Sequence, residues 1–215
     1  MISPMRHHRR ARTFTKLSAA IFVALAAVAC GVFSGPPPAQ REPGFRADSV
    51  RRPAVFVRVS ISQDFEEREW NRIGSEYQGA VEEALNRLGL LPVDTTFAAG
   101  AGQHPLEGLD RARPLARARE TGAEHLLIVD ARLARGRVTV CRESKQPRSG
   151  TAAFWEAGLE IRRASDGQPL LVNPGEGRAV EVDVDCRTGQ VTRRKSMDVM
   201  IEESVDAVLA PFGPR

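Results

Sequence analysis

Cys141 and Cys186 are the residues in the second half of the chain whose thiols could form covalent bonds. Cys141 follows the β-branched run 138–140, and Cys186 continues the alternating valines of 180–184. A nucleophilic cysteine needs an exposed thiolate stabilised by a cation or a helix end, which a strand does not supply. The pair is therefore expected either to form a disulfide or to remain two buried thiols. In a simple meander the two would lie roughly 10 Å apart, so a disulfide requires neighbouring strands or a bend.

Catalysis by serine, histidine and aspartate requires a histidine next to the nucleophile. Beyond the first thirty residues the sequence offers only His104, before Pro105 in a Gly-rich stretch, and His125, at the start of an apolar run. No G-x-S-x-G motif, which would place a serine on a sharp strand-to-helix turn, accompanies them. We interpret the two histidines as loop and strand-end residues and predict no nucleophilic active site.

Glu181, Asp183 and Asp185 alternate with valines, so the three carboxylates are expected on one face of a strand. Calcium prefers such oxygen ligands, but side chains two positions apart in a strand are separated by about 7 Å. One ion could not bind all three without ligands from a loop. A solvated face, or ion pairs with arginines of a neighbouring strand, is the favoured interpretation. Those arginines are Arg132, Arg135 and Arg137.

The sequence contains no complete cofactor motif. Gly100-Ala101-Gly102 is followed by Pro105 where a dinucleotide-binding loop needs its third glycine. There is no phosphate-binding loop, zinc spacing or EF-hand. We therefore predict no catalytic, cofactor-binding or metal-binding residues, and a protein that is not an enzyme.

Residues 1–29 have the pattern of a secretion signal. Five basic residues precede an apolar run from Leu17 to Ala29. The run has about 13 residues, about 20 Å as a helix, and is too short to cross a hydrocarbon core of about 30 Å. A cleaved signal is therefore expected rather than a membrane-spanning helix.

The residues before Cys30 allow two kinds of cleavage. Ala27-Val28-Ala29 fits an ordinary signal-peptidase site. The same stretch resembles a bacterial lipobox, in which the cysteine is lipidated and becomes the amino terminus, although Ala27 stands where that motif prefers Leu. The resemblance implies a lipid on Cys30. Gly31 replaces the Asp that retains lipoproteins in the inner membrane, which implies the outer membrane, facing the periplasm. A soluble periplasmic protein is the alternative.

The leader also changes the meaning of the net charge. The chain is formally +4, and removal of the five basic residues of the leader leaves −1 for residues 30–215. A near-neutral chain lacks the basic excess typical of nucleic-acid binding, so no nucleic-acid partner is expected.

Lipidation of Cys30 would leave Cys141 and Cys186 as an even pair, and an oxidising envelope permits a disulfide between them.

Residues 30–52 are rich in Pro and Gly and are expected to form a tether, with Pro-Pro-Pro at 36–38 favouring extended geometry. Residues 53–215 have the length of one domain. Apolar periodicity predicts the elements of that domain. They are strands at 54–62, 125–140, 153–161 and 178–186, a short strand at 91–93, and helices at 66–88, 106–121 and 195–212. A loop is expected at 95–104, and Asp166-Gly167 is expected to form a turn.

This order, β-α-(β)-α-β-β-β-α, predicts an α+β fold with a mixed sheet and helices on one face. Two stretches add a resemblance. Residues 117–128 (RARETGAEHLLI) are similar to an A-x-x-x-G-A-D-Y-V-L junction, and residues 161–170 (IRRASDGQPL) to an L-x-D-x-x-T-G-x-x-L hairpin. Both resemble the TolB amino-terminal domain and the CsgG-like and penicillin-binding-protein-activator lipoproteins. The departures are Glu124 for Asp, His125 for Tyr, and Ser165-Asp166 for Glu-Thr.

The resemblance implies a non-catalytic adaptor or assembly role and transfers no binding residue. We therefore expect an exported envelope protein, anchored through lipid on Cys30, that binds another envelope protein. The sequence leaves its oligomeric state open. The long loop 142–150 (RESKQPRSG) is a candidate contact site. The alternatives are a periplasmic ligand-sensing domain and a small hydrolase that uses carboxylates.

Overall fold

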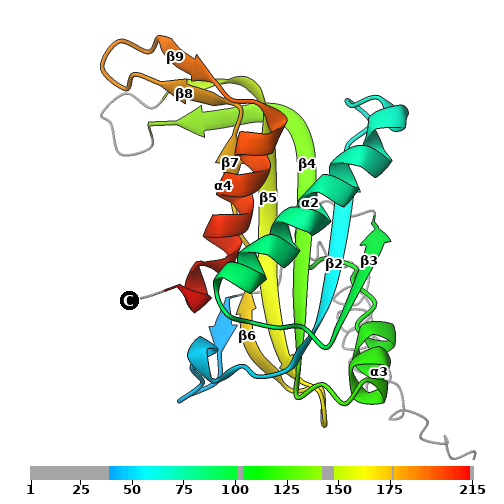
Figure 1. Ribbon diagram of the computed structural model, residues 1–215. Helices are drawn as coiled ribbons and strands as arrows, with labels where there is room; N and C mark the ends of the chain where they lie inside the picture. Colours follow the sequence, from blue (N-terminus) through cyan, green and yellow to red (C-terminus); the bar gives the residue numbers. More distant parts are fainter. Residues whose placement is uncertain (1–38, 101–103, 142–147, 176, 214–215) are drawn as a thin grey trace, which may run out of the picture. The chain divides into compact units, whose positions relative to one another are not determined.

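The computed structural model describes residues 39–100, 104–141, 148–175 and 177–213 (Figure 1). The expected secretion signal, Cys30 and most of the loop expected at 142–150 lie outside the described residues. In the part of the chain that is described, no helix is both long enough and apolar enough to cross a membrane.

Helices and strands follow one another in a mixed order along the chain. The elements are β1 (Gln40–Arg41), η1 (Ala47–Ser49), β2 (Pro53–Ile61), α2 (Glu67–Arg87), β3 (Asp94–Ala99), α3 (Ala112–Glu120), β4 (His125–Val140), β5 (Arg148–Arg163), β6 (Pro169–Asn173), β7 (Ala179–Val180), β8 (Val182–Val184), β9 (Val191–Arg194), α4 (Met197–Leu209) and η2 (Ala210–Phe212).

Most strands belong to one mixed sheet with the spatial order β1-β6-β5-β4-β2-β3, and β7 lies beside β5. β2 is parallel to both β3 and β4. The strands from β4 through β5 and β6 to β1 are antiparallel. β8 and β9 form a separate two-stranded sheet. The predicted α+β fold with a mixed sheet is confirmed.

One face of the sheet carries the larger part of the core. The valines at 55, 57 and 59 alternate inward along β2 and pack with residues of α2 and α4. Tyr77 of α2 and Trp155 of β5 lie in this cluster with ring centroids 4.6 Å apart. Figure 1 shows α2 and α4 crossing in front of the long strands. The predicted strand 54–62 and helix 66–88 agree with β2 and α2.

The opposite face is covered by α3 and by residues 104–111. Ala118 of α3 packs in a smaller cluster with Ala54 and Leu126, which point away from α2. All helices were expected on one face, whereas α3 lies on the other. The reason is the strand order: β3 and β4 flank β2 on opposite sides. Two right-handed crossovers that run in opposite directions place their helices on opposite faces.

The helix expected at 106–121 is shorter, since α3 begins at Ala112. Pro114 lies in its first turn, where a missing N–H costs little. Gly122 ends it with a positive φ of 71°, a conformation that glycine adopts without strain. Both positions agree with the sequence pattern.

The position of β3 differs from the prediction. A short strand was predicted at 91–93 and a loop at 95–104, but the strand covers Asp94–Ala99. Thr95, Thr96 and Phe97 favour strands. However, each residue of β3 is at least partly exposed, so no apolar alternation marks the strand. β3 forms because the parallel pairing with β2 satisfies its backbone.

The strand predicted at 178–186 is divided into β7 and β8. The break lies at Glu181, whose N–H donates to the carbonyl of Ala153 while its carboxylate accepts the N–H of Ala153. The side chain thus ends the ladder with β5, and β8 pairs with β9 instead. β6 and β9 were not predicted.

Part of the expected tether belongs to the domain. β1 pairs with β6 through Gln40 and Arg41. Val50 is fully buried in the larger core cluster, and Phe45 packs against that cluster. These apolar anchors hold residues 39–52 on the domain, so ordered structure begins before residue 53.

Candidate functional site

Two strands of the sheet, β4 and β5, extend beyond the other strands as a long two-stranded ribbon. β4 and β5 have 16 residues each, about 50 Å as strands. β2 accompanies β4 only as far as Leu133. Beyond it, β4 and β5 continue with the β8–β9 hairpin near their end (Figure 1). We call residues 134–141, 148–154 and 182–194 the arm.

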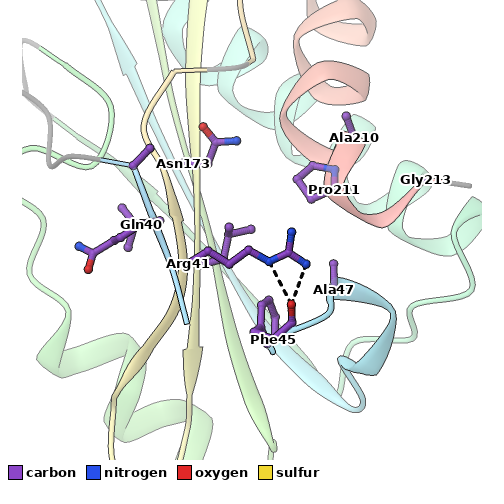
Figure 2. A pocket seen from close by; sticks show the side chains of 11 residues that line it. Gln40, Arg41, Phe45, Ala47, Asn173, Ala210, Pro211 and Gly213 are labelled. Atoms are coloured by element: carbon purple, nitrogen blue, oxygen red, sulfur yellow. Dashed lines mark hydrogen bonds between the residues drawn. The ribbon is translucent and has the colours of Figure 1, made fainter. Parts of the chain in front are cut away.

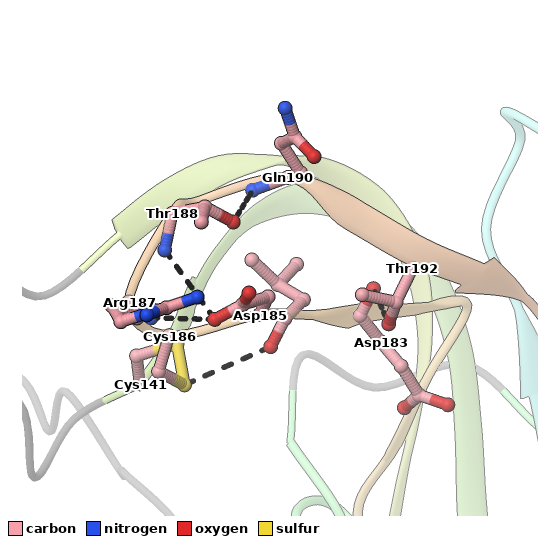
Figure 3. The surroundings of a disulfide bond; sticks show 9 residues. Cys141, Asp183, Asp185, Cys186, Arg187, Thr188, Gln190 and Thr192 are labelled. Carbon is pink, nitrogen blue, oxygen red and sulfur yellow. Dashed lines mark hydrogen bonds between the residues drawn. A yellow bond between two sulfur atoms is a disulfide. The ribbon is translucent and has the colours of Figure 1, made fainter.

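A disulfide between Cys141 and Cys186 joins the two parts of the arm (Figure 3). The Cα atoms are 5.4 Å apart. The separation of two strands that a meander would impose is avoided because β8 leaves the ladder and belongs to a separate sheet. Cys186 is exposed rather than part of a core face. Of the two outcomes expected from the sequence, the disulfide is the one that is present, and disulfides are typical of exported proteins.

Glu181 and Asp183 form ion pairs, as one of the two interpretations predicted. Glu181 lies 3.9 Å from Arg135 of β4 and 3.5 Å from Arg194 of β9. Asp183 lies 2.9 Å from the Lys195 ammonium. Only Arg135 belongs to the arginines named from the sequence; the other two cations are Arg194 of β9 and Lys195, which directly follows β9.

Asp185 has a structural role in the turn between β8 and β9. Its Oδ1 accepts the backbone N–H groups of Arg187 and Thr188, at 2.7 and 3.3 Å (Figure 3). The hydrogen bonds from Arg187 and Thr188 hold the pKa of this carboxyl below its usual value. In the described ranges, no group of three or more His, Cys, Asp or Glu side chains could hold a metal ion.

Two further carboxylates are buried, and the first is Asp130. Register places it directly opposite Arg58 of β2. Nε and Nη2 of Arg58 donate to the two carboxylate oxygens at 2.7 and 2.6 Å. Asp130 also accepts the N–H of Leu106, and Arg58 also donates to the carbonyl of Glu107. The ion pair therefore fixes residues 104–111 over the sheet.

Glu160 of β5 is the second buried carboxylate, with no exposed surface. It accepts hydrogen bonds from Arg111, at 2.8 and 3.1 Å, and from Arg162. Arg111 also donates to the carbonyls of Leu106 and Leu109. This ion pair fixes the same segment at its other end.

These buried charges are the residues that sequence patterns did not identify. Arg58 is the one charged residue of β2, and Asp130 follows the apolar run 126–129 of β4, whereas Glu160 lies in a strand with other charged residues. A single charged residue in such a run signals a buried pair, because a strand covered on both faces tolerates a charge only with a partner. The carboxylate oxygens are occupied by arginine donors, an arrangement suited to holding a loop rather than to moving protons.

The two histidines lie in different parts of the fold. His104 is exposed and its backbone N–H donates to the carboxylate of Glu107. Nδ1 of His125, at the start of β4, lies 3.2 Å from the carbonyl oxygen of Arg51. In the described part of the chain, neither imidazole is hydrogen-bonded to a nucleophilic side chain. The loop and strand-end positions agree with the sequence interpretation.

β3 forms one edge of the sheet, and among the described residues no strand pairs with its outer side. Exposed apolar side chains lie along this edge: Leu91 is 72% exposed, and Val93 and Phe97 are more than one third exposed. The Phe97 ring also covers Gly74 of α2, where an added Cβ would lie 3.0 Å from the ring. The edge therefore offers unpaired backbone groups together with apolar surface.

A groove of about 860 Å³ runs between β3 and α3. Phe56, Leu109 and Pro114 supply its apolar lining. Arg117 lies at its rim and donates twice to the carboxylate of Asp94, at 3.1 Å each. The groove is within the size range of small-ligand sites, but the charged groups of this ion pair already satisfy one another.

A second cavity of about 550 Å³ lies between β1, β6 and η2 (Figure 2). Arg41 is the charged residue of its described lining. Its guanidinium donates to the carbonyl of Phe45 at 2.6 and 3.0 Å. The cavity thus lies beside the first described residues of the domain. The guanidinium of Arg41 serves to hold the turn at Phe45.

No protein-family profile matches this sequence, and no curated protein does. Several solved structures share parts of the fold. The PelC dodecamer of Paraburkholderia phytofirmans is 13% identical, with a TM-score of 0.42, over 83% of this chain and 96% of that one. A neuraminyllactose-binding hemagglutinin homolog of Helicobacter pylori is 9% identical, with a TM-score of 0.37, over 83% and 87%.

The hypothetical protein CT253 of Chlamydia trachomatis is 10% identical, with a TM-score of 0.38, over 74% of this chain and 94% of that one. Similarity at these TM-scores and sequence identities describes the outline of the fold and supports no conclusion about function. The TolB, CsgG-like and activator families are not among these three structures, so that resemblance stays a prediction.

Proposed function

We propose that this chain is an exported envelope protein, anchored through lipid on Cys30, that acts as a non-catalytic binding or assembly module. The observation that carries the proposal is the open edge of β3. An unpaired edge with exposed apolar side chains is a template for pairing with another chain. Proteins that do not use such an edge usually protect it with charges, proline or a covering loop.

The engagement of the buried charges supports a non-catalytic role. A general acid or base must be able to reach the proton that it transfers. Asp130 and Glu160 instead hold residues 104–111 through arginine partners. The carboxylate-hydrolase alternative is therefore the less favoured one.

The anchoring part of the proposal rests on the lipobox resemblance at Cys30 and on the disulfide, which fits an oxidising compartment. The outer membrane, facing the periplasm, is the proposed location, and a soluble periplasmic form is the alternative. An adaptor role of the kind implied by the resemblance to TolB and CsgG-like lipoproteins agrees with an exposed binding edge.

Photo-crosslinking in intact cells tests the binding edge. A photoreactive amino acid at Leu91, beside β3, is expected to give a discrete adduct of higher mass. The matched control is the same amino acid at Glu83, an exposed position on α2, which is expected to give none. The mass of the adduct distinguishes a second copy of this chain from another protein.

A second substitution makes the test specific for the edge. Thr95→Lys places a charge on β3 and is expected to abolish the adduct at position 91, because lysine opposes edge pairing. Equal adducts at positions 91 and 83, or an adduct unaffected by Thr95→Lys, would contradict the proposal.

Ligand sensing is the second candidate function, and the groove between β3 and α3 favours it. Its volume of about 860 Å³ suits a small molecule. Thermal unfolding in the presence of envelope small molecules distinguishes the candidates. A ligand that raises Tm in the original chain but not in a Leu109→Arg variant would support sensing over assembly.

A further inference from the structure

We propose that the arm contacts an anionic lipid surface, namely the membrane that holds Cys30. The contact is made by exposed arginines of the arm with lipid phosphates, and the inference rests on the proposed anchor. Three kinds of observation carry it: the unpaired charges on the arm, the exposed apolar residue beside them, and the direction from which the chain enters the domain.

Three exposed arginines of the arm have no partner among the described residues. Arg137 of β4, Arg187 of the β8–β9 turn and Arg193 of β9 are exposed. Within the described ranges, none of their side chains has an ion pair or a hydrogen bond. Arginine donors match phosphate oxygens closely, and a basic segment near an anionic leaflet is attracted to it.

The described acidic residues of the β8–β9 hairpin do not form ion pairs with Arg187 or Arg193. Asp183 is paired with Lys195 at 2.9 Å, and Asp185 accepts N–H groups within its own turn, at 2.7 Å from Arg187 (Figure 3). Asp183 is therefore paired with a cation, and Oδ1 of Asp185 is occupied by backbone donors of its own turn. The guanidinium groups of Arg187 and Arg193 remain available to an external anion.

An apolar side chain lies between these arginines in the sequence. Val191, the first residue of β9, is 52% exposed and pairs with Val184 of β8. An exposed apolar residue flanked by arginines suits the membrane interface, where the apolar group inserts at the headgroup level and the cations contact phosphates.

The direction of β1 agrees with a contact between the arm and the membrane that holds Cys30. Gln40 pairs with Val172, which pairs in turn with Glu160 of β5. Arg41 pairs with Leu171, and Leu171 pairs with Ile161. β1 therefore runs parallel to β5, which begins at the arm. The Gln40 end of β1 is thus the end that faces the arm.

The length of the tether fits this direction. Gln40 lies ten positions after Cys30 in the sequence, and an extended Pro-rich segment spans about 3 Å per residue, or about 30 Å over that distance. From Glu160 to the start of β5 is about 40 Å along the strand, and less in a straight line because the strands curve (Figure 1). A membrane that holds Cys30 is thus within reach of the arm.

Vesicle flotation of the exported full-length chain carrying Cys30→Ser tests the arm without the lipid. Ala27-Val28-Ala29 still permits cleavage of the leader, which the mass of the purified protein verifies. Binding to phosphatidylcholine vesicles that contain phosphatidylglycerol is expected at low salt. Binding to vesicles of phosphatidylcholine alone, or at high salt, is expected to be lost.

Arg187→Gln with Arg193→Gln is expected to weaken that binding roughly tenfold or more, since each arginine near an anionic surface contributes about fivefold. The matched control is Arg68→Gln with Arg113→Gln, exposed arginines of α2 and α3, which is expected to bind like the unsubstituted chain. Equal binding by both double variants, or no preference for phosphatidylglycerol, overturns the inference. An unmodified Cys30 in the native protein would instead contradict the anchor alone.

Discussion

Cys141 and Cys186 are separated by 45 positions in the chain and joined by a disulfide. The loop that this bond closes contains all of β5, β6, β7 and β8. The bond connects the end of β4 to a hairpin that belongs to a different sheet. It therefore restrains the arm by tying the end of β4 to the β8–β9 hairpin.

Loss of the disulfide should destabilise the protein measurably. In the chain-entropy account, a cross-link over a loop of this length contributes up to about 4 kcal/mol to the free energy of unfolding. Cys141→Ser with Cys186→Ser is expected to lower Tm, and reductant is expected to do the same to the unsubstituted protein. Thermal unfolding measures both effects.

Cys30→Ser, compared with the chain produced without its lipid, is the matched control, because it removes a cysteine that lies outside the cross-link. Its Tm should equal that of the unsubstituted chain. If the double serine variant unfolds at the same temperature as this control, the disulfide does not restrain the folded domain.

Neutralising Asp130 should have a large effect, since it leaves the Arg58 guanidinium buried without a counter-charge. Asp130→Asn is expected to lower the free energy of unfolding by about 3–5 kcal/mol, as measured by urea denaturation. Asp48→Asn removes an acidic partner from the exposed Arg46–Asp48 pair and should have no measurable effect. Equal stability of the two variants would show that the buried pair does not hold residues 104–111.

Burial of Tyr77 is expected to make the folded protein less stable at alkaline pH, and this effect can be observed directly. Burial raises the pKa of Tyr77 above its usual value, although a hydrogen bond to Ser204 acts in the opposite direction. The unfolded chain releases this proton near pH 10 while the folded chain retains it, so stability falls as pH rises above that value. Tyr77 is the chain's one tyrosine, so tyrosinate absorbance reports this residue alone.

The tyrosinate signal is expected to appear together with unfolding, as followed by circular dichroism, and not before it. Tyr77→Phe should remove this contribution to the alkaline loss of stability. A tyrosinate signal near pH 10 in a fully folded protein would contradict the buried, hydrogen-bonded position of the phenol.

Gly177 brings the segment before β7 close to α4. A Cβ at this position would lie 2.6 Å from the Cβ of Ala157, 2.8 Å from that of Val208 and 2.9 Å from the carbonyl oxygen of Ser204. Gly177→Ala is expected to cost about 1–3 kcal/mol, as overpacking typically does. Gly175→Ala is the matched control, because nothing lies within 4 Å of its added Cβ. Similar denaturation midpoints for the two variants would refute this close packing.

The sequence predicted the elements that have strong periodicity. The valines of β2 and the apolar stripe of α2 identified those elements because each set lies on one side of its element and packs in the larger core cluster. β3 was not identified, since pairing with β2 rather than burial stabilises it. The position of α3 followed from strand order, which periodicity does not encode.

The candidate surfaces were predicted less completely. The cysteines were identified as a pair, but their connection depends on the bend after Glu181, which a side-chain hydrogen bond produces. The partners of Asp130 and Glu160 come from distant segments, so composition alone did not reveal them. The open edge of β3 could not be predicted before β3 itself.

The mass of the mature protein, purified from membranes without reductant, tests the central claim most directly. The expected species begins at Cys30, carries a diacylglyceryl group on that residue, and has Cys141 and Cys186 in the oxidised state. A soluble protein that begins at an unmodified Cys30 would contradict the proposal of a lipid-anchored envelope module.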